Sequence, residues 1–134
     1  MILGIDPGER RVGLAIADPE TRFARPLEVI DSRRTDPASR IAEIVAAEGV
    51  TVVVVGRPVG LSGRPGAAVE AQAKLVGALQ RRLEVPVREF DERLTTVVAE
   101  SALRSGGASA AARRRLRDAV AAQVLLQDYL DASG

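Results

Sequence analysis

Residues 1–17 read MILGIDPGERRVGLAIA, and this stretch decides the fold. The apolar run at 1–5 predicts a buried strand, and Asp6 follows it directly. The Pro-Gly pair after Asp6 supplies the backbone angles of a tight turn. A second apolar run at 12–17 predicts the partner strand, so Asp6 is expected where the first strand of a hairpin ends.

Outward from this hairpin, the chain alternates strands and helices. The predicted elements are a third strand at 25–30, a helix from Asp36-Pro37 to Gly49, a β-branched strand at 50–55, an amphipathic helix at 67–83, a strand at 85–90, a short helix from Thr95 or Thr96 to Gly106-Gly107, and a last helix from Ser109 to about 132. Pro86 favours an edge position for the fifth strand. We expect the helix at 67–83 to bury Val69, Ala73, Val76 and Leu79 or Gln80.

This order of elements predicts one α/β domain spanning residues 1–134. Three meandering strands followed by alternating helices and strands give a mixed five-stranded sheet, with three antiparallel strands and then two parallel ones, flanked by helices. That is the strand sequence of an RNase H-like fold.

Composition excludes several kinds of chemistry. The 134 residues include no Cys and no His, which excludes zinc sites, disulfides, Cys nucleophiles and Ser-His-Asp triads. Aromatic residues make up only 2%, too few for the stacking platforms of common single-strand binders. Carboxylates must therefore carry any acid–base or metal chemistry.

The charge balance is less decisive. A net charge of +1 does not by itself predict a polyanionic partner. All of the 19 basic residues except Lys74 are Arg, however, and the planar guanidinium group is suited to binding phosphate. A GC-rich coding sequence explains the same bias equally well. Because the N-terminus shows no signal peptide and no apolar stretch approaches the roughly 18 residues of a membrane span, we expect a cytoplasmic protein.

Two acids are placed where a site would form. Asp6 ends the first strand, where ligands and metals commonly bind in such sheets. The alternative is a structural role, in which Asp6 accepts a hydrogen bond from the backbone of the following turn. Asp118 shares a helical stripe with Ala121, Ala122, Leu125, Leu126 and Tyr129, which must face the sheet. Burying a carboxylate there removes its hydration, which is unfavourable unless a cation or hydrogen-bond donors contact it. The helix dipole, or ion pairs with Arg114 and Arg115, are the structural alternatives.

The third candidate acid is Asp91 or Glu92, directly after the fifth strand. Consecutive side chains of an extended chain point in opposite directions, so only one of the two would aim at Asp6. Three carboxylates with oxygen donors suit Mg²⁺ or Mn²⁺, and two such ions would support phosphodiester cleavage.

Arginines surround these acids. The Gly-rich loop at 56–66 contains two of them and precedes a helix, so it is a candidate phosphate cradle, with an ordinary surface loop as the alternative. The residues expected to include the phosphate contacts are Arg10, Arg11, Arg57, Arg64, Arg114 and Arg115.

Taken in order, these motifs resemble the YqgF/RuvX family over nearly the whole chain. The matching segments are Gly4–Gly8, Arg11–Ala15, Val55–Pro58, Asp91–Thr96, Asp118–Ala122 and Leu126–Leu130. The resemblance implies an RNase H-like fold related to the RuvC resolvases, with Holliday junction resolution or 5′-end maturation of pre-16S rRNA as the activity. It also implies Asp6, Glu92 and Asp118 as the metal-binding acids. The loop at 61–66 departs from the family's usual Asn- and Asp-containing version, which leaves its substrate contact open.

Two other classes remain possible. The first hairpin also resembles the phosphate-binding hairpin of actin-like kinases and ATPases, which need two such domains. A non-catalytic nucleic-acid-binding or ribosome-assembly module is the stronger alternative. Few Asn, Gln or aromatic residues lie near the predicted site, so we expect recognition by shape and backbone, with structured RNA favoured over junction DNA on the resemblance alone. A homodimer would suit a two-fold junction.

Overall fold

The computed structural model describes residues 1–57, 66–91 and 110–133, with the side chains of 110–117 outside that description. In chain order the elements are β1 (Ile2–Asp6), β2 (Arg11–Ala17), β3 (Ala24–Asp31), α1 (Pro37–Glu48), β4 (Val52–Arg57), α2 (Ala67–Arg82), β5 (Val87–Asp91) and α4 (Ala110–Ala132). The short helix predicted at Thr95 or Thr96 lies outside the described residues.

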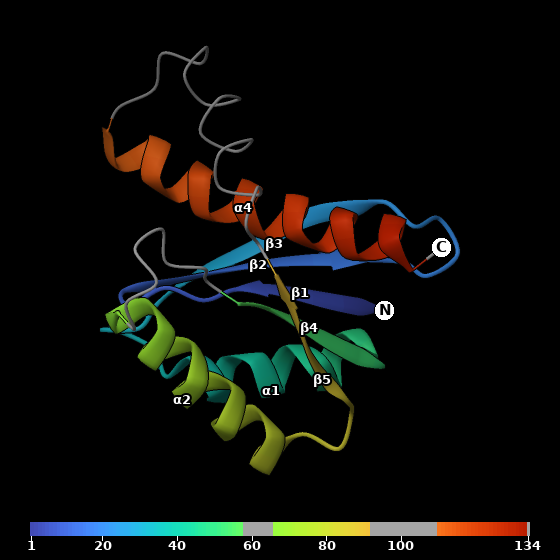
Figure 1. The fold of residues 1–134 in the computed structure, drawn as a ribbon, viewed down its shortest axis with the longest axis horizontal. Helices are drawn as coiled ribbons and strands as arrows, with labels where there is room; N and C mark the ends of the chain where they lie inside the picture. The colour runs from blue at the N-terminus through green and yellow to red at the C-terminus, as the bar shows by residue number, and fades with distance from the viewer. Residues whose placement is uncertain (58–65, 92–109, 134) are drawn as a thin grey trace.

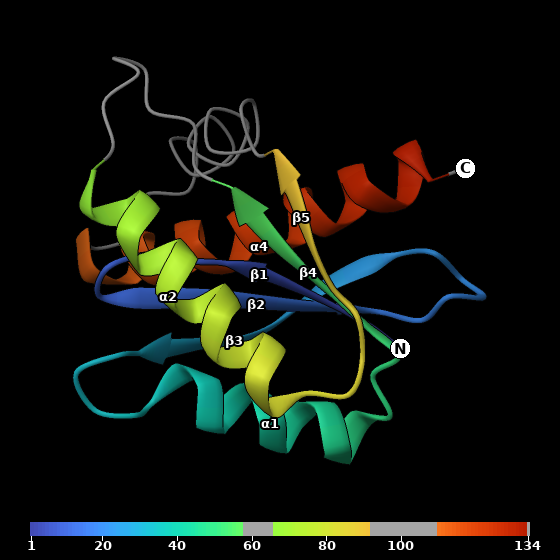
Figure 2. The same ribbon diagram turned by 60° about the horizontal axis from the view of Figure 1, so that its bottom comes forward.

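The described strands form one five-stranded sheet in the order β3-β2-β1-β4-β5. β1 pairs antiparallel with β2, and β2 pairs antiparallel with β3. β4 runs parallel to both β1 and β5, so the carboxyl ends of these three strands meet at one edge (Figure 2). The predicted mixed sheet is confirmed, including the edge position of the fifth strand.

Helices cover the two faces of the sheet in separate layers. α1 and α2 lie on one face, and α4 crosses the other (Figure 1). The α1/α2 face carries the larger core, which includes Leu3, Ile5, Leu14 and Ile16 from the first hairpin. The α4 face carries a smaller, Ala-rich core. Because side chains alternate along a strand, each strand of the hairpin contributes to both layers.

The predicted buried stripe of α2 needs correction. Val76 is buried as expected, and of the alternatives Leu79 and Gln80 it is Leu79 that is buried. Ala73, however, is exposed, and Gln72 is buried. The Gln72 side chain donates a 2.6 Å hydrogen bond to Glu89 of β5, so a polar residue lies on the buried stripe because it has a partner on the sheet.

The strands after α1 also begin later than predicted. β4 starts at Val52 and β5 at Val87, each two residues into its apolar run. Thr51 instead donates its backbone N–H to the carbonyl of Met1, and Pro86 accepts from the backbone of Val53. Residues 50–51 and 85–86 are therefore connections, from α1 to β4 and from α2 to β5.

The start of α1 follows the sequence signals directly. The Asp36 side chain accepts from the backbone N–H of Ser39, and Pro37 occupies the first turn. The Ser39 hydroxyl also donates to this carboxylate, and the hydroxyl and backbone hydrogen bonds together lower the pKa of Asp36. Gly49 ends the helix with a left-handed φ of 64°, which a residue with a side chain would adopt less easily.

Candidate active site

Asp6 lies at the carboxyl end of β1, on the side of the sheet that α4 covers. Alternation along β1 sets its face, since Leu3 and Ile5 belong to the α1/α2 core. Gly4, on the same face as Asp6, packs against Leu126 of α4. Asp6 itself is directly opposite Gly13 of β2. The predicted position at a strand end is therefore confirmed, and it faces the last helix.

Asp118 approaches the same point from α4. Its backbone carbonyl lies over Gly13, the residue paired with Asp6. The stripe predicted to continue from Asp118 is the buried one, with Ala121, Ala122, Leu125 and Leu126 among the buried residues. The fold thus places Asp118 over Gly13, the strand partner of Asp6, although the two aspartates are more than a hundred residues apart in the sequence.

Arg11 holds the Asp118 carboxylate. Its Nε donates to Oδ2 of Asp118 at 2.9 Å, and the two side chains are 25% and 19% exposed. The sequence predicted phosphate contact from Arg11 and left ion pairs with Arg114 and Arg115 as one structural alternative for Asp118; the side chains of those two arginines lie outside the described residues. Arg11 and Gly13 are on the same face of β2, so Arg11 holds the Asp118 carboxylate on the α4 side of the sheet, where Asp6 also lies.

The contact between β2 and α4 depends on glycine at position 13. A Cβ built there would lie 2.2 Å from the carbonyl oxygen of Asp118 and 2.8 Å from its carbonyl carbon. Real Cβ atoms essentially never come closer than 3.0 Å to such atoms. Sequence reasoning missed this role, although the Val-Gly-Leu-Ala pattern places a glycine inside a strand, which signals close backbone approach.

Asp91 and Arg57 lie at the same edge but on the other face. They are paired in register across β4 and β5. Glu89, two residues before Asp91, contacts Gln72 of α2, so alternation places Asp91 on the α1/α2 side. The same reasoning places Arg57 with the buried Val53 and Val55 of the larger core. Asp91 is therefore not on the face where Asp6 and Asp118 meet.

The remaining predicted residues are only partly described. Glu92 and Arg64 lie outside the described residues, and Arg10 is exposed in the turn that joins β1 to β2. No group of three acids that could hold a metal ion is present in the described part of the chain. The described site thus consists of Asp6, Asp118 and Arg11 around Gly13.

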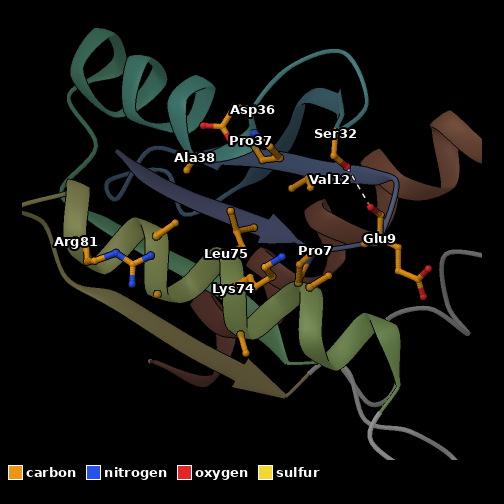
Figure 3. Close-up of a pocket in the computed structure, with 15 residues that line it drawn as sticks. Pro7, Glu9, Val12, Ser32, Asp36, Pro37, Ala38, Lys74, Leu75 and Arg81 are labelled. Atoms are coloured by element: carbon orange, nitrogen blue, oxygen red, sulfur yellow. Dashed lines mark hydrogen bonds between the residues drawn. The ribbon is translucent and has the colours of Figure 1, made fainter.

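A separate cleft of about 610 Å³ opens on the α1/α2 side (Figure 3). It lies between the β1–β2 turn, the start of α1 and one face of α2. Its charged lining residues are Glu9, Asp36, Lys74 and Arg81. Asp6, Asp118 and Arg11 do not line it, so it is distinct from the carboxylate pair.

The fold matches solved structures of RuvC-type resolvases. Thermus thermophilus RuvC in complex with a Holliday junction substrate superposes with a TM-score of 0.60 at 20% identity, covering 98% of this chain and 94% of that one. The fowlpox virus resolvase, solved with Holliday junction DNA, superposes with a TM-score of 0.59 at 11% identity, covering 98% and 97%. The architecture is therefore that of the RNase H-like resolvases.

Sequence comparison places the chain more narrowly. Residues 1–132 match the family model described as RuvX: Holliday junction resolvase. A protein of Chloroflexus aggregans named "Putative pre-16S rRNA nuclease" is 48% identical, covering 98% of this chain and 93% of its own length. A Nocardioides protein of the same name is 46% identical, covering 96% and 86%. The chain belongs to the RuvX family, a nuclease family, as the motifs in the sequence indicated.

Within the described residues, no helix is long and apolar enough to cross a membrane.

Proposed function

We propose that this protein is a divalent-metal-dependent endonuclease that hydrolyses phosphodiester bonds in structured nucleic acid. The observation that carries the proposal is the meeting of Asp6 and Asp118 at Gly13, on one face of a RuvC-type sheet. In a chain without Cys or His, carboxylates are the available metal ligands.

The donor set fits Mg²⁺ or Mn²⁺. Both ions prefer carboxylate oxygens, and Asp6 and Asp118 provide them from two different elements. When bound, such an ion activates water and stabilises the leaving oxygen. Arg11 holds one oxygen of Asp118, which limits the orientations of that carboxylate.

Glu92 completes the proposed set, in preference to Asp91. Asp91 lies on the α1/α2 side, and successive residues of a strand alternate between faces. The face of Asp91 therefore counts against it as a partner of Asp6 and Asp118. The matching family motif points to the same choice.

The proposed substrate is the structured 5′ region of precursor 16S rRNA, with junction DNA as the alternative. The relatives' names favour the RNA and the family description favours the junction. We expect metal-dependent cleavage of a precursor rRNA fragment, compared in one buffer with a four-way DNA junction, in Mg²⁺, Mn²⁺ or excess chelator. Symmetric cleavage of the junction with intact RNA would reverse the substrate assignment. Cleavage of neither would favour a non-catalytic nucleic-acid-binding or ribosome-assembly module.

The arginines of the Gly-rich loop give a second prediction. Arg57 is exposed at the end of β4, and Arg64 belongs to the Gly-rich segment of the sequence that lies outside the described residues. If both contact phosphate, Arg57→Gln with Arg64→Gln should lower the salt dependence of substrate binding by about two units, roughly one for each lost contact. An unchanged affinity and salt dependence would remove this loop from the substrate site.

A further inference from the structure

The α4 side of β5 carries a small cluster that the predicted site does not use. Arg88 and Phe90 both point toward Tyr129 of α4. The Arg88 guanidinium donates a 2.6 Å hydrogen bond from Nη1 to the Tyr129 hydroxyl. The rings of Phe90 and Tyr129 meet edge to face, with centroids 5.9 Å apart and planes at 89°. These contacts join the edge strand β5 to α4.

The cluster orients Arg88 without neutralising it. Tyr129 is a neutral partner, and none of the ion pairs among the described residues includes Arg88. The side chain is exposed. A guanidinium has five N–H donors in a planar fork, so the bond to Tyr129 leaves a charged group with several donors available to solvent.

The position of Arg88 relates it to the carboxylate pair. Its contact with α4 puts it on the same face of the sheet as Asp6 and Asp118. Tyr129 follows Asp118 by eleven residues on one helix, a separation of about 16 Å along the helix axis. A substrate bound at the acids could therefore extend along α4 to Arg88.

We propose that Arg88, oriented by Tyr129 and Phe90, binds a backbone phosphate of the substrate at a distance from the cleavage site. This inference rests on the proposed nuclease function and adds a contact far from the acids. An oriented arginine recognises phosphate with paired hydrogen bonds and reads no base sequence, which agrees with recognition by shape and backbone.

The test measures binding in excess chelator, so that cleavage does not enter the result. The probes are a four-way DNA junction and a precursor rRNA fragment, each titrated at several salt concentrations. Arg88→Gln should weaken binding about tenfold and lower the salt dependence by about one unit. Arg88→Lys should restore the salt dependence because it restores the charge. Tyr129→Phe, which keeps the charge and removes the orienting hydroxyl, should weaken binding with the salt dependence unchanged.

Arg81→Gln is the matched control. Arg81 is also exposed, but it lies on α2, across the sheet. It should leave binding of both probes close to wild type. The inference is overturned if Arg88→Gln behaves like Arg81→Gln, or if it lowers only the melting temperature, as a purely structural link between β5 and α4 would. It is also overturned if the wild type binds neither probe. A wild type that binds through Arg88 but cleaves nothing would contradict the nuclease function and support this contact.

Discussion

Asp6→Asn and Asp118→Asn should each lower metal-dependent cleavage at least about 100-fold, beyond the roughly 10–100-fold typical of outer-shell contacts to a metal. Asparagine keeps the shape of the side chain and removes the negative charge that a divalent ion requires. Asp6 is paired with Gly13, and Asp118 approaches that residue from α4, so each loss affects the same point in space. Cleavage rates in Mg²⁺ and Mn²⁺, with melting temperatures, test the expectation.

Two controls separate catalysis from folding. Asp91→Asn removes an acid at the same edge of the sheet but on the α1/α2 face, and it should cleave almost as well as the wild type. Arg11→Gln breaks the ion pair with Asp118 while keeping both acids, so its melting temperature reports what that ion pair contributes. If both Asn variants remain folded and cleave at the wild-type rate, these carboxylates do not hold the metal. A large loss in Asp91→Asn would restore Asp91 as the third ligand.

The sequence predicted the topology well because local patterns determine it here. The first hairpin is marked by two apolar runs around Pro7-Gly8, and the β-branched run that contains β4 has the pattern of a strand buried on both faces. The positions of Asp6 and Asp118 in the fold could be predicted because one ends a strand and the other lies on an apolar stripe. Both signals are local in the sequence.

The contacts that assemble the site are not local, and they were missed for that reason. Nothing near Arg11 in the sequence shows that Asp118, 107 residues away, accepts its hydrogen bond. The buried Gln72 depends in the same way on Glu89 across the sheet. Periodicity predicts which face of an element is buried, but it does not predict which polar groups meet there.

Gly13→Ala should cause the largest loss from a single added methyl group. The new Cβ would lie 2.2 Å from the Asp118 carbonyl oxygen, and reaching 3.0 Å requires the helix or the strand to move by at least 0.8 Å. Overpacking of this kind costs about 1–3 kcal/mol of unfolding free energy, which lowers Tm by several degrees. Because the displaced residue is itself a proposed metal ligand, cleavage should also fall, by up to about 100-fold for a shift near 1 Å.

Gly77→Ala makes the same chemical change but is expected to raise the free energy of unfolding instead of lowering it. Gly77 lies inside α2, and its added Cβ would come no closer than 3.6 Å to Arg81, an ordinary van der Waals contact. Alanine in a helix interior is more favourable than glycine by about 1 kcal/mol, so Tm should rise and cleavage should stay at the wild-type level. Thermal unfolding and cleavage rates of the two variants, measured together, isolate the close approach of β2 to α4. A Gly13→Ala protein as stable and active as the wild type would mean that this approach is not needed to hold Asp118 beside Asp6.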